Sequence, residues 1–296
     1  MNPSPIIVGL GEVLWDLLPG GRQLGGAPAN FAYCSHVLGN RGIVVSRAGD
    51  DRLGSELRQR LREAGLSDEY VQPDSGHATG TVNVKLDSAG KPEFEITYPA
   101  AWDFLEWNQQ LEKLASNCDA VCFGTLAQRS PQSRSTILKF LHATRDDCLT
   151  VFDVNLRQSF FSAEIILHSL KNAHAVKLNE DELPVISNVL GIVAEDFCKK
   201  IVARFDLQFV CVTRGERGSV LYARSGLHEH PGFRVEVTDT VGAGDAFTAG
   251  LIHEYLRGAS LAQMNETANR MGAWVASQLG GMPRQSDGKL DALRLL

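Results

Sequence analysis

The sequence of 296 residues lacks the usual signals of membrane, secreted and nucleic-acid-binding proteins. No apolar stretch reaches the ~18 residues that a transmembrane helix needs. The first residues carry no positively charged segment, and their apolar run is only as long as a strand, so we expect no signal peptide. The 29 Lys and Arg residues are spread along the chain and the net charge is −6, which argues against nucleic acid or membrane as a partner. We therefore expect a cytoplasmic protein.

The cysteines lack the spacing of a disulfide framework or of a zinc site. None belongs to a CxxC pair, and most lie in apolar runs, as reduced core cysteines do. This pattern fits a reducing compartment. A chain of this length buries ~75% of its unfolded surface and needs no crosslinks to build a core. The six are Cys34, Cys118, Cys122, Cys148, Cys198 and Cys211.

Short apolar runs alternate with longer segments of helical periodicity. The runs are apolar on both faces, which is typical of strands in a buried parallel sheet. The order predicts one α/β domain over residues 1–296, with a doubly wound, mostly parallel central sheet flanked by helices and ligands at the carboxyl ends of its strands. The predicted strands are 6–10, 43–47, 120–123, 149–153, 175–178 and 209–213. The predicted helices are 28–38, 52–64, 131–144, 194–205, and two long ones from 243 and 261.

Two segments have a different period. Residues 80–87 and 93–98 alternate polar and apolar side chains around the sequence Ser-Ala-Gly-Lys-Pro, which predicts a hairpin with one face in water. Such a hairpin should project from the main body. A surface hairpin without a role remains the alternative.

Residues 239–245 read Asp-Thr-Val-Gly-Ala-Gly-Asp. Gly242, Ala243 and Gly244 suit a turn whose backbone N–H groups converge on an anion. Apolar residues follow at helical spacing, so the turn should lie at the positive end of a helix, where phosphate binds well. Asp245 beside a phosphate makes chemical sense mainly as a base that takes a proton from an attacking hydroxyl. The alternative is a tight turn with an ordinary helix-terminal carboxylate.

This heptapeptide matches Asp-Thr-x-Gly-Ala-Gly-Asp, the second signature of the ribokinase-like carbohydrate kinases, often called the PfkB family. Near the N-terminus, Gly25, Gly26 and Asn30 resemble the first signature, Gly-Gly-x-x-x-Asn. The resemblance covers essentially the whole chain. The segments GEVLWDLLP, PAAWDF and DVNLRQSFF look most like bacterial fructokinases.

The sugar side of the predicted site lies near the first strand. Asp16 follows that strand, where a carboxylate can accept hydrogen bonds from two neighbouring sugar hydroxyls. By resemblance, Asp16, Gly25, Gly26 and Asn30 hold the sugar; the alternative is a turn before a helix, with Asn30 exposed. Arg157 follows a strand end, where its guanidinium could bind a phosphate oxygen or a substrate hydroxyl.

Two further polar residues, Asp153 and Asn155, lie at the same strand end as Arg157. They could support the site on its phosphate side. A plain surface role is nearly as good an interpretation, so their role stays open.

The nucleotide side depends on two weaker motifs. Asn179 and Glu182 match the family's Asn-x-x-Glu pattern, which the resemblance assigns to Mg²⁺ and phosphates, with Glu182 acting through water. The same spacing also fits a helix capping box. Thr213, Gly215 and Gly218 belong to TRGERG, which resembles the family's ATP loop, with a hairpin turn as the alternative.

Other phosphate and metal motifs are incomplete. The segment from Gly9 has Leu14 where a dinucleotide fingerprint needs its third glycine, and no P-loop is present. His228 and His230 have no third ligand at useful spacing, so we expect a solvated turn there rather than a metal site.

The resemblance implies two further features. A small β-sheet, built from segments near 12–25 and 77–100, would cover the sugar as a lid and could mediate a homodimer. Potassium would bind between Asp239, Thr240 and the turn of residues 279–283, which contains Gly281. For that turn, a glycine C-cap of the preceding helix is the alternative.

These features together predict an ATP-dependent kinase that phosphorylates a primary hydroxyl, with fructose as the favoured substrate. Asp245 would be the base, and the N–H groups of residues 242–245 would form the anion hole. The alternatives are a 2-keto-3-deoxygluconate, ribose or nucleoside kinase of the same fold, or a sugar-binding regulator without catalysis. The sugar, the phosphorylated hydroxyl and the oligomeric state stay open.

Overall fold

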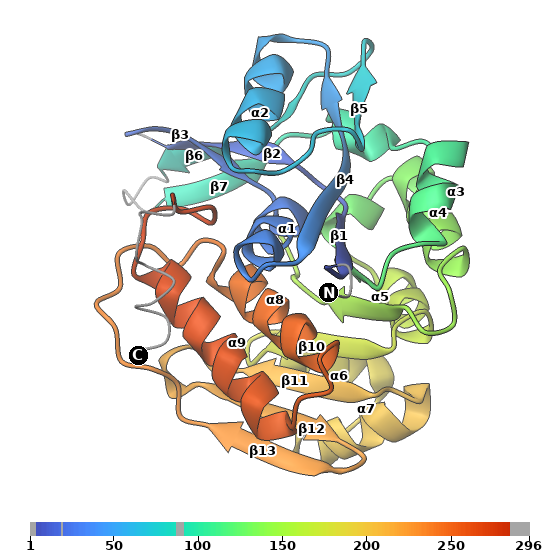
Figure 1. The fold of residues 1–296 in the computed structure, drawn as a ribbon, viewed down its shortest axis with the longest axis vertical. Helices are drawn as coiled ribbons and strands as arrows, with labels where there is room; N and C mark the ends of the chain where they lie inside the picture. The colour runs from blue at the N-terminus through green and yellow to red at the C-terminus, as the bar shows by residue number, and fades with distance from the viewer. Residues whose placement is uncertain (1–3, 19, 87–91, 285–296) are drawn as a thin grey trace.

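A nine-stranded sheet forms the centre of the protein (Figure 1). The computed structural model describes residues 4–18, 20–86 and 92–284. Every neighbouring pair from β11 to β5 is parallel, while β12 and β13 are antiparallel additions at one edge. The strand order is β13 (Gly226–His230), β12 (Ser219–Ala223), β11 (Phe209–Thr213), β10 (Ala175–Asn179), β9 (Leu149–Asp153), β8 (Ala120–Phe123), β1 (Ile6–Leu10), β4 (Arg41–Gly49) and β5 (Val71–Asp74).

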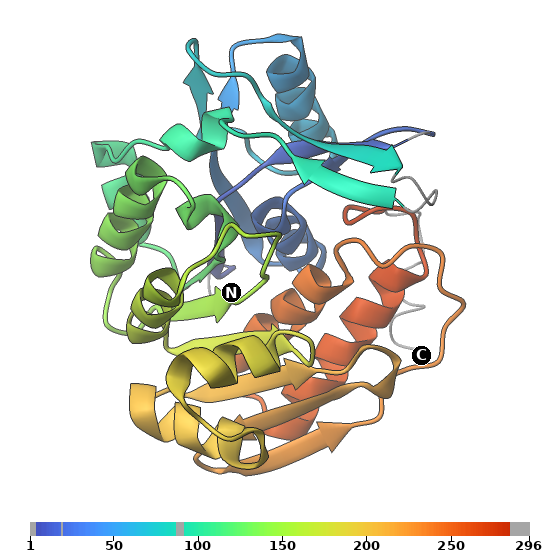
Figure 2. The same ribbon diagram turned by 180° about the vertical axis from the view of Figure 1, so that it is seen from behind.

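Helices cover both faces of this sheet (Figures 1 and 2). The core therefore has two layers, one on each side of the strands. One face packs against α1 (Ala27–Val37), α2 (Arg52–Glu63), α8 (Ala243–Tyr255) and α9 (Leu261–Ala276). The other packs against α3 (Gln109–Ala115), α4 (Pro131–His142), α5 (Ala163–Lys171), α6 (Leu183–Leu190) and α7 (Phe197–Phe205).

Burial on both faces explains the apolar strand sequences. In β1, Ile7 packs into one layer of the core, while Val8 and Leu10 pack into the other. The predicted doubly wound α/β fold is confirmed. The chain turns from one side of β1 to the other between β4 and β8, and such a reversal opens a crevice at the carboxyl ends of the strands.

A second, smaller sheet lies beside the main body. Its order is β3 (Gly21–Gly25), β2 (Leu14–Leu18), β6 (Gly80–Leu86) and β7 (Pro92–Ile96), with β2 and β6 parallel. The predicted pair of strands at 80–87 and 93–98 is confirmed as β6 and β7, although most of the turn between them lies outside the described residues. A role of this sheet as a lid, and the domain limits given above, stay predictions.

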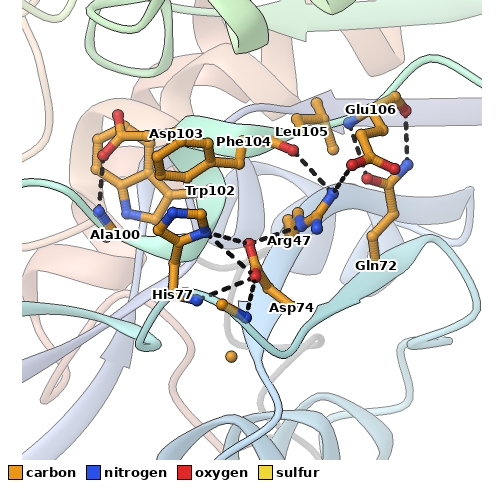
Figure 3. Close-up of polar contacts among 12 residues, drawn as sticks. Arg47, Gln72, Asp74, His77, Ala100, Trp102, Asp103, Phe104, Leu105 and Glu106 are labelled. Atoms are coloured by element: carbon orange, nitrogen blue, oxygen red, sulfur yellow. Dashed lines mark hydrogen bonds and ion pairs between the residues drawn. The ribbon is translucent and has the colours of Figure 1, made fainter.

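A polar cluster fastens both ends of the segment that carries β6 and β7 (Figure 3). The buried carboxylate of Asp74 accepts hydrogen bonds from Arg47 Nε (2.8 Å) and from the backbone N–H of His77 (3.0 Å). The His77 ring stacks on Phe104 at 3.4 Å between centroids, and Arg47 Nη1 donates to the Phe104 carbonyl (2.9 Å). The entry and the exit of the segment are thus tied to the edge of the main sheet.

Several elements were missing from the prediction. Strands β5 and β13 and helices α3, α5 and α6 were not expected, and the predicted helix 194–205 is a 3₁₀ turn, Ala194–Asp196, followed by α7. The prediction of a solvated turn at His228 and His230 is wrong, because both lie in β13. His230 is buried, and its Nε2 lies 2.8 Å from Glu266 Oε2.

None of the six cysteines forms a disulfide, and all but the half-buried Cys198 are buried, as expected for core cysteines. Among the described residues, no helix is both long and apolar enough to cross a bilayer.

Gly9 allows α1 to pack directly on β1. A Cβ at this position would overlap the carbonyl oxygen of Pro28, in the first turn of the helix. We expect Gly9→Ala to lower the free energy of unfolding by about 1–3 kcal/mol, since the backbone must shift. Gly76→Ala is the matched control, because its Cβ would meet Asp74 Oδ1 at an ordinary 3.5 Å. Equal loss of stability in the two variants, measured by urea denaturation, would contradict this account of the packing.

Candidate active site

The two glycine-rich segments meet at one hydrogen bond. Asn30 in α1 donates from Nδ2 to Asp245 Oδ2 in α8 at 2.9 Å, although the two residues are 215 positions apart in the sequence. Asn30 is 3% exposed, so the alternative of an exposed Asn30 is wrong. The fold therefore holds a carboxylate at the positive end of a helix, as the sequence predicted.

The environment of Asp245 favours its protonated form. Burial, followed by the nearby charge of Asp153, raises the pKa of Asp245 to about 6. The hydrogen bond from Asn30 and the charges of Lys177 and Arg157 act in the opposite direction. Because a base works best with a pKa near the working pH, this value suits proton transfer near neutrality.

The first turn of α8 exposes backbone donors. Gly242 is its N-cap with φ 78°, a left-handed conformation that favours glycine. The N–H of Ala243 already donates to the Thr240 carbonyl (3.2 Å). The N–H groups of Gly242, Gly244 and Asp245 have no partner within the described part of the chain, and can bind an anion.

Buried polar groups lie behind this turn. Asp153, at the end of β9, accepts from Lys177 Nζ through Oδ1 (3.1 Å) and from Thr248 Oγ1 through Oδ2 (2.9 Å). Burial alone would lower the pKa of Lys177, but the carboxylates of Asp153, Glu182 and Asp245 together raise it. The ammonium therefore stays charged.

The loop after β9 has an unusual backbone. Asn155 and Gln158 have φ of 41° and 50°, a region that residues other than glycine rarely adopt. Thr125 Oγ1 donates to the Val154 carbonyl (3.0 Å), and the N–H of Leu156 donates to Glu182 Oε1 (2.8 Å). These bonds hold the loop that carries Arg157.

Arg157 is exposed. Its positive charge favours the ionised forms of Glu12, Asp16 and Asp245. Burial raises the pKa of Glu12 to about 7. Burial, followed by the charge of Asp239, raises that of Asp16 to about 6.

Close packing explains the two glycines of the first motif. Asp16 lies in β2, and a Cβ at Gly25 in the neighbouring β3 would overlap Asp16 Oδ2. Gly26 has φ 105°, and a Cβ there would lie 2.6 Å from the Glu12 carbonyl oxygen. These contacts bring Asp16, Gly25, Gly26 and Asn30 to the same end of α1.

A cavity of about 1350 Å³ adjoins the other side of the α8 turn. Ala243 and Gly244 are among the residues that line it. Thr213, Gly215 and Gly218 line it, as predicted for a nucleotide loop. That loop also connects the antiparallel strands β11 and β12, so it is the turn of a β-hairpin, as the alternative interpretation predicted. The segment 230–235 and α9, which also line the cavity, were not predicted; they contribute His230, Pro231, Gly232, Phe233, Arg234, Val235, Asn269, Gly272, Ala273 and Ala276.

Asn179 and Glu182 form a reciprocal pair. Asn179 N–H donates to Glu182 Oε2 (2.9 Å), and Glu182 N–H donates to Asn179 Oδ1 (2.8 Å). The bonds have the pattern of a capping box, but they close the turn between β10 and α6, whose N-cap is Glu182 without a side-chain cap bond. With the bond from Leu156, each oxygen of Glu182 accepts one backbone N–H and keeps a second lone pair for water.

The predicted cation loop is assembled from two distant segments. Asp239 accepts from the N–H of Val241 (3.0 Å) and of Gly280 (3.1 Å). Gly281 lies against Gly242 and Asn30. Helix α9 ends at Ala276 with Ser277 as its C-cap, so the alternative of a glycine C-cap is wrong.

Among the residues whose positions are described, no group of three or more His, Cys, Asp or Glu side chains could hold a metal ion. A cation at this site would thus depend on backbone oxygens, water or phosphate. The sequence analysis also missed Lys177, Thr248 and Glu12. The detectable signal was a lysine inside the apolar strand run of β10, since buried lysines are rare.

Residues 20–287 match the family described as pfkB family carbohydrate kinase. A fructokinase of Klebsiella pneumoniae is 34% identical over 255 residues, which cover 82% of this chain and 82% of that protein. A double-mutant fructokinase of Vibrio cholerae, solved with fructose, ADP and potassium ion, has a TM-score of 0.81 at 25% identity, covering 99% and 97% of the two chains. A sugar kinase of Pyrococcus horikoshii, solved with ATP, has a TM-score of 0.79 at 27% identity, covering 94% and 95%.

Proposed function

Because the chain belongs to the pfkB family of carbohydrate kinases, we propose that it is a fructokinase that transfers the γ-phosphoryl group of ATP to a primary hydroxyl of fructose. The observation that carries the proposal is the contact of Asn30 with Asp245 beside the free N–H groups of the α8 turn. It joins a sugar-binding segment to a base and an anion site. Fructokinases among the relatives support the choice of fructose.

The geometry accounts for each step of the transfer. ATP lies in the cavity lined by Thr213, Gly215 and Gly218, with its γ-phosphoryl group at the α8 turn. Asp245 takes the proton of the hydroxyl as its oxygen forms the new bond to phosphorus. The bond from phosphorus to the β-phosphate oxygen breaks and ADP leaves. The N–H groups of Gly242 and Gly244 stabilise the charge on the phosphoryl oxygens, while the N–H of Ala243 donates to the Thr240 carbonyl.

The sugar is held on the side of Asp16. Its carboxylate accepts hydrogen bonds from hydroxyls, and the guanidinium of Arg157 closes the site from the loop after β9. Asn30 both positions Asp245 and borders the sugar, next to Gly25 and Gly26. Closure by the second sheet, a homodimer through it and a cytoplasmic location stay predictions.

Mg²⁺ fits this site only through phosphate and water. The free lone pairs of Glu182 can accept hydrogen bonds from water on the ion, and Asn179 holds Glu182 in place. When bound, Mg²⁺ would neutralise charge on the phosphates. Potassium would be held by Asp239, Thr240 and Gly281.

A panel of sugars tests the substrate. We expect kcat/KM for fructose to exceed that for ribose, adenosine and 2-keto-3-deoxygluconate by at least ~10-fold, as measured by ADP release. Asp16→Ala should raise KM for fructose by about 10- to 150-fold and leave KM for ATP nearly unchanged, because a charged hydrogen bond is worth about 1.5–3 kcal/mol. Exposed Asp146 provides the control variant Asp146→Ala. A tenfold preference for another sugar would overturn the assignment.

Substitution of the base tests the mechanism. Asp245→Asn keeps the shape but cannot accept the proton, so kcat should fall by at least ~10²-fold while ATP still binds and Tm changes little. Normal turnover would rule out Asp245 as the base.

The same residue sets a pH limit. Asp245 must be ionised to act, and its pKa is raised to about 6, so activity is full above that value and declines below it. We expect kcat/KM for ATP, at saturating fructose, to fall about tenfold per pH unit below about pH 6. A flat profile down to pH 4.5 would contradict the assignment.

Exchange of potassium tests the cation loop. Ordering of Asp239 and Gly281 around an ion would fix the turn that carries Gly242, so removal should lower kcat and leave fructose affinity unchanged. The measurement replaces potassium with tetramethylammonium at constant ionic strength. Unchanged turnover would show that the loop binds no functional ion.

A further inference from the structure

A buried lysine lies behind the phosphate-binding turn. Lys177, near the carboxyl end of β10, is 6% exposed and is flanked by the fully buried Val176 and Leu178. Its one hydrogen-bond partner in the described part of the structure is Asp153 (3.1 Å). An ammonium has three donors, so this hydrogen bond uses one of them, and nearby carboxylates provide the rest of the compensation for burial.

The ammonium lies against the first turn of α8. A Cβ at Gly244 would lie 3.0 Å from Lys177 Nζ, so the ammonium lies close against the backbone of this residue. Gly244 and Ala243 line the cavity that the proposed function assigns to the nucleotide. The positive charge therefore lies directly behind the backbone that would face the γ-phosphoryl group.

Asp153 connects this lysine to the helix. Its second oxygen accepts from Thr248 Oγ1 (2.9 Å), and the same hydroxyl lies 3.0 Å from the carbonyl oxygen of Gly244. Asp153, Lys177 and Thr248 belong to β9, β10 and α8. The three side chains thus fix the turn relative to two strands of the central sheet.

We propose that Lys177 is a positioning residue for phosphoryl transfer: anchored by Asp153, its ammonium holds the Gly244 turn and adds positive charge behind it. The inference depends on the proposed function, which places the γ-phosphoryl group at this turn. The effect falls on the transferring group, because the N–H donors gain strength as charge builds on the phosphoryl oxygens. The affinity for the sugar should not change, because the proposed sugar site lies on the other side of Asp245.

Lys177→Met removes the charge and keeps the length of the side chain. We expect kcat to fall by about 10²-fold, as for loss of a group that stabilises developing charge, with KM for the sugar changed less than threefold. A kcat within threefold of the wild type would overturn the inference. An increase in KM for the sugar without a change in kcat would overturn it as well.

A double variant separates this role from simple charge balance. Lys177→Met leaves Asp153 buried without a counter-ion, and the variant could fail to fold for that reason. Lys177→Met combined with Asp153→Asn leaves a neutral pair that still accepts from Thr248. We expect the double variant to fold, with a normal circular dichroism spectrum, and to stay at least ~30-fold below the wild-type kcat. Recovery of kcat would show that Lys177 only balances Asp153, which would sink the proposal.

The pH profile gives an independent measurement. The groups that face Asp245 are Asn30 from α1, Asp153 from β9, Lys177 from β10, Glu12 and Arg157 from two loops, and the thiols of Cys34 and Cys122. Loss of the Lys177 charge should raise the pKa of Asp245, so the decline of activity at low pH should begin at a higher pH. In the double variant, which loses one charge of each sign, the decline should return to its wild-type position. An unmoved decline in Lys177→Met would contradict the proposal.

Asp245→Asn distinguishes a failure of the proposed function from a failure of the role proposed for Lys177. All variants are assayed with the sugar that the wild type turns over best, so the choice of fructose does not affect the result. If Asp245→Asn stays active, the placement of the phosphoryl site fails. If Asp245→Asn is inactive and Lys177→Met is normal, only the role of Lys177 fails.

Discussion

The site depends on a backbone contact that no side chain could tolerate. Gly281 lies against Gly242. A Cβ on Gly242 would overlap the Cα of Gly281, and a Cβ on Gly281 would lie 2.5 Å from the Asn30 side chain. The turn of residues 279–283 is therefore wedged between α1 and the start of α8. Because the hydrogen bond of Asn30 to Asp245 spans the same gap, any displacement of that turn would move the carboxylate.

The same compactness gives the site an excess of negative charge. Burial raises the pKa of Glu12, Asp16 and Asp245, and the charge of Asp245 adds to the effect on Glu12. The positive groups nearest to them are Lys177 and Arg157. Such crowding costs stability, and proteins keep it where function requires it.

Local chemistry predicted the turn that begins α8 and the strands of the central sheet, whereas the sugar side of the site was assigned by resemblance. Glycines that need a left-handed backbone, such as Gly242, and apolar strands buried on both faces are visible in single segments. The role of Lys177 could not be read in this way. Its partners come from β9 and α8, and only the order of strands in the sheet makes them neighbours. Strand β13, with the sequence Gly-Leu-His-Glu-His, was missed because an edge strand needs few apolar residues.

The second sheet is attached to the main body at several places. Arg129 Nε and Nη2 each lie 2.8 Å from an oxygen of the buried Asp103, and Nη2 also donates to the Thr97 carbonyl (2.7 Å), just beyond β7. The cluster around Asp74 holds the entry to β6 in the same way. A further attachment lies in β2, where the buried Trp15 donates from Nε1 to the Leu53 carbonyl (2.9 Å) in α2. Because Asp16 is the next residue of β2, this bond also fixes the position of its carboxylate relative to the main body.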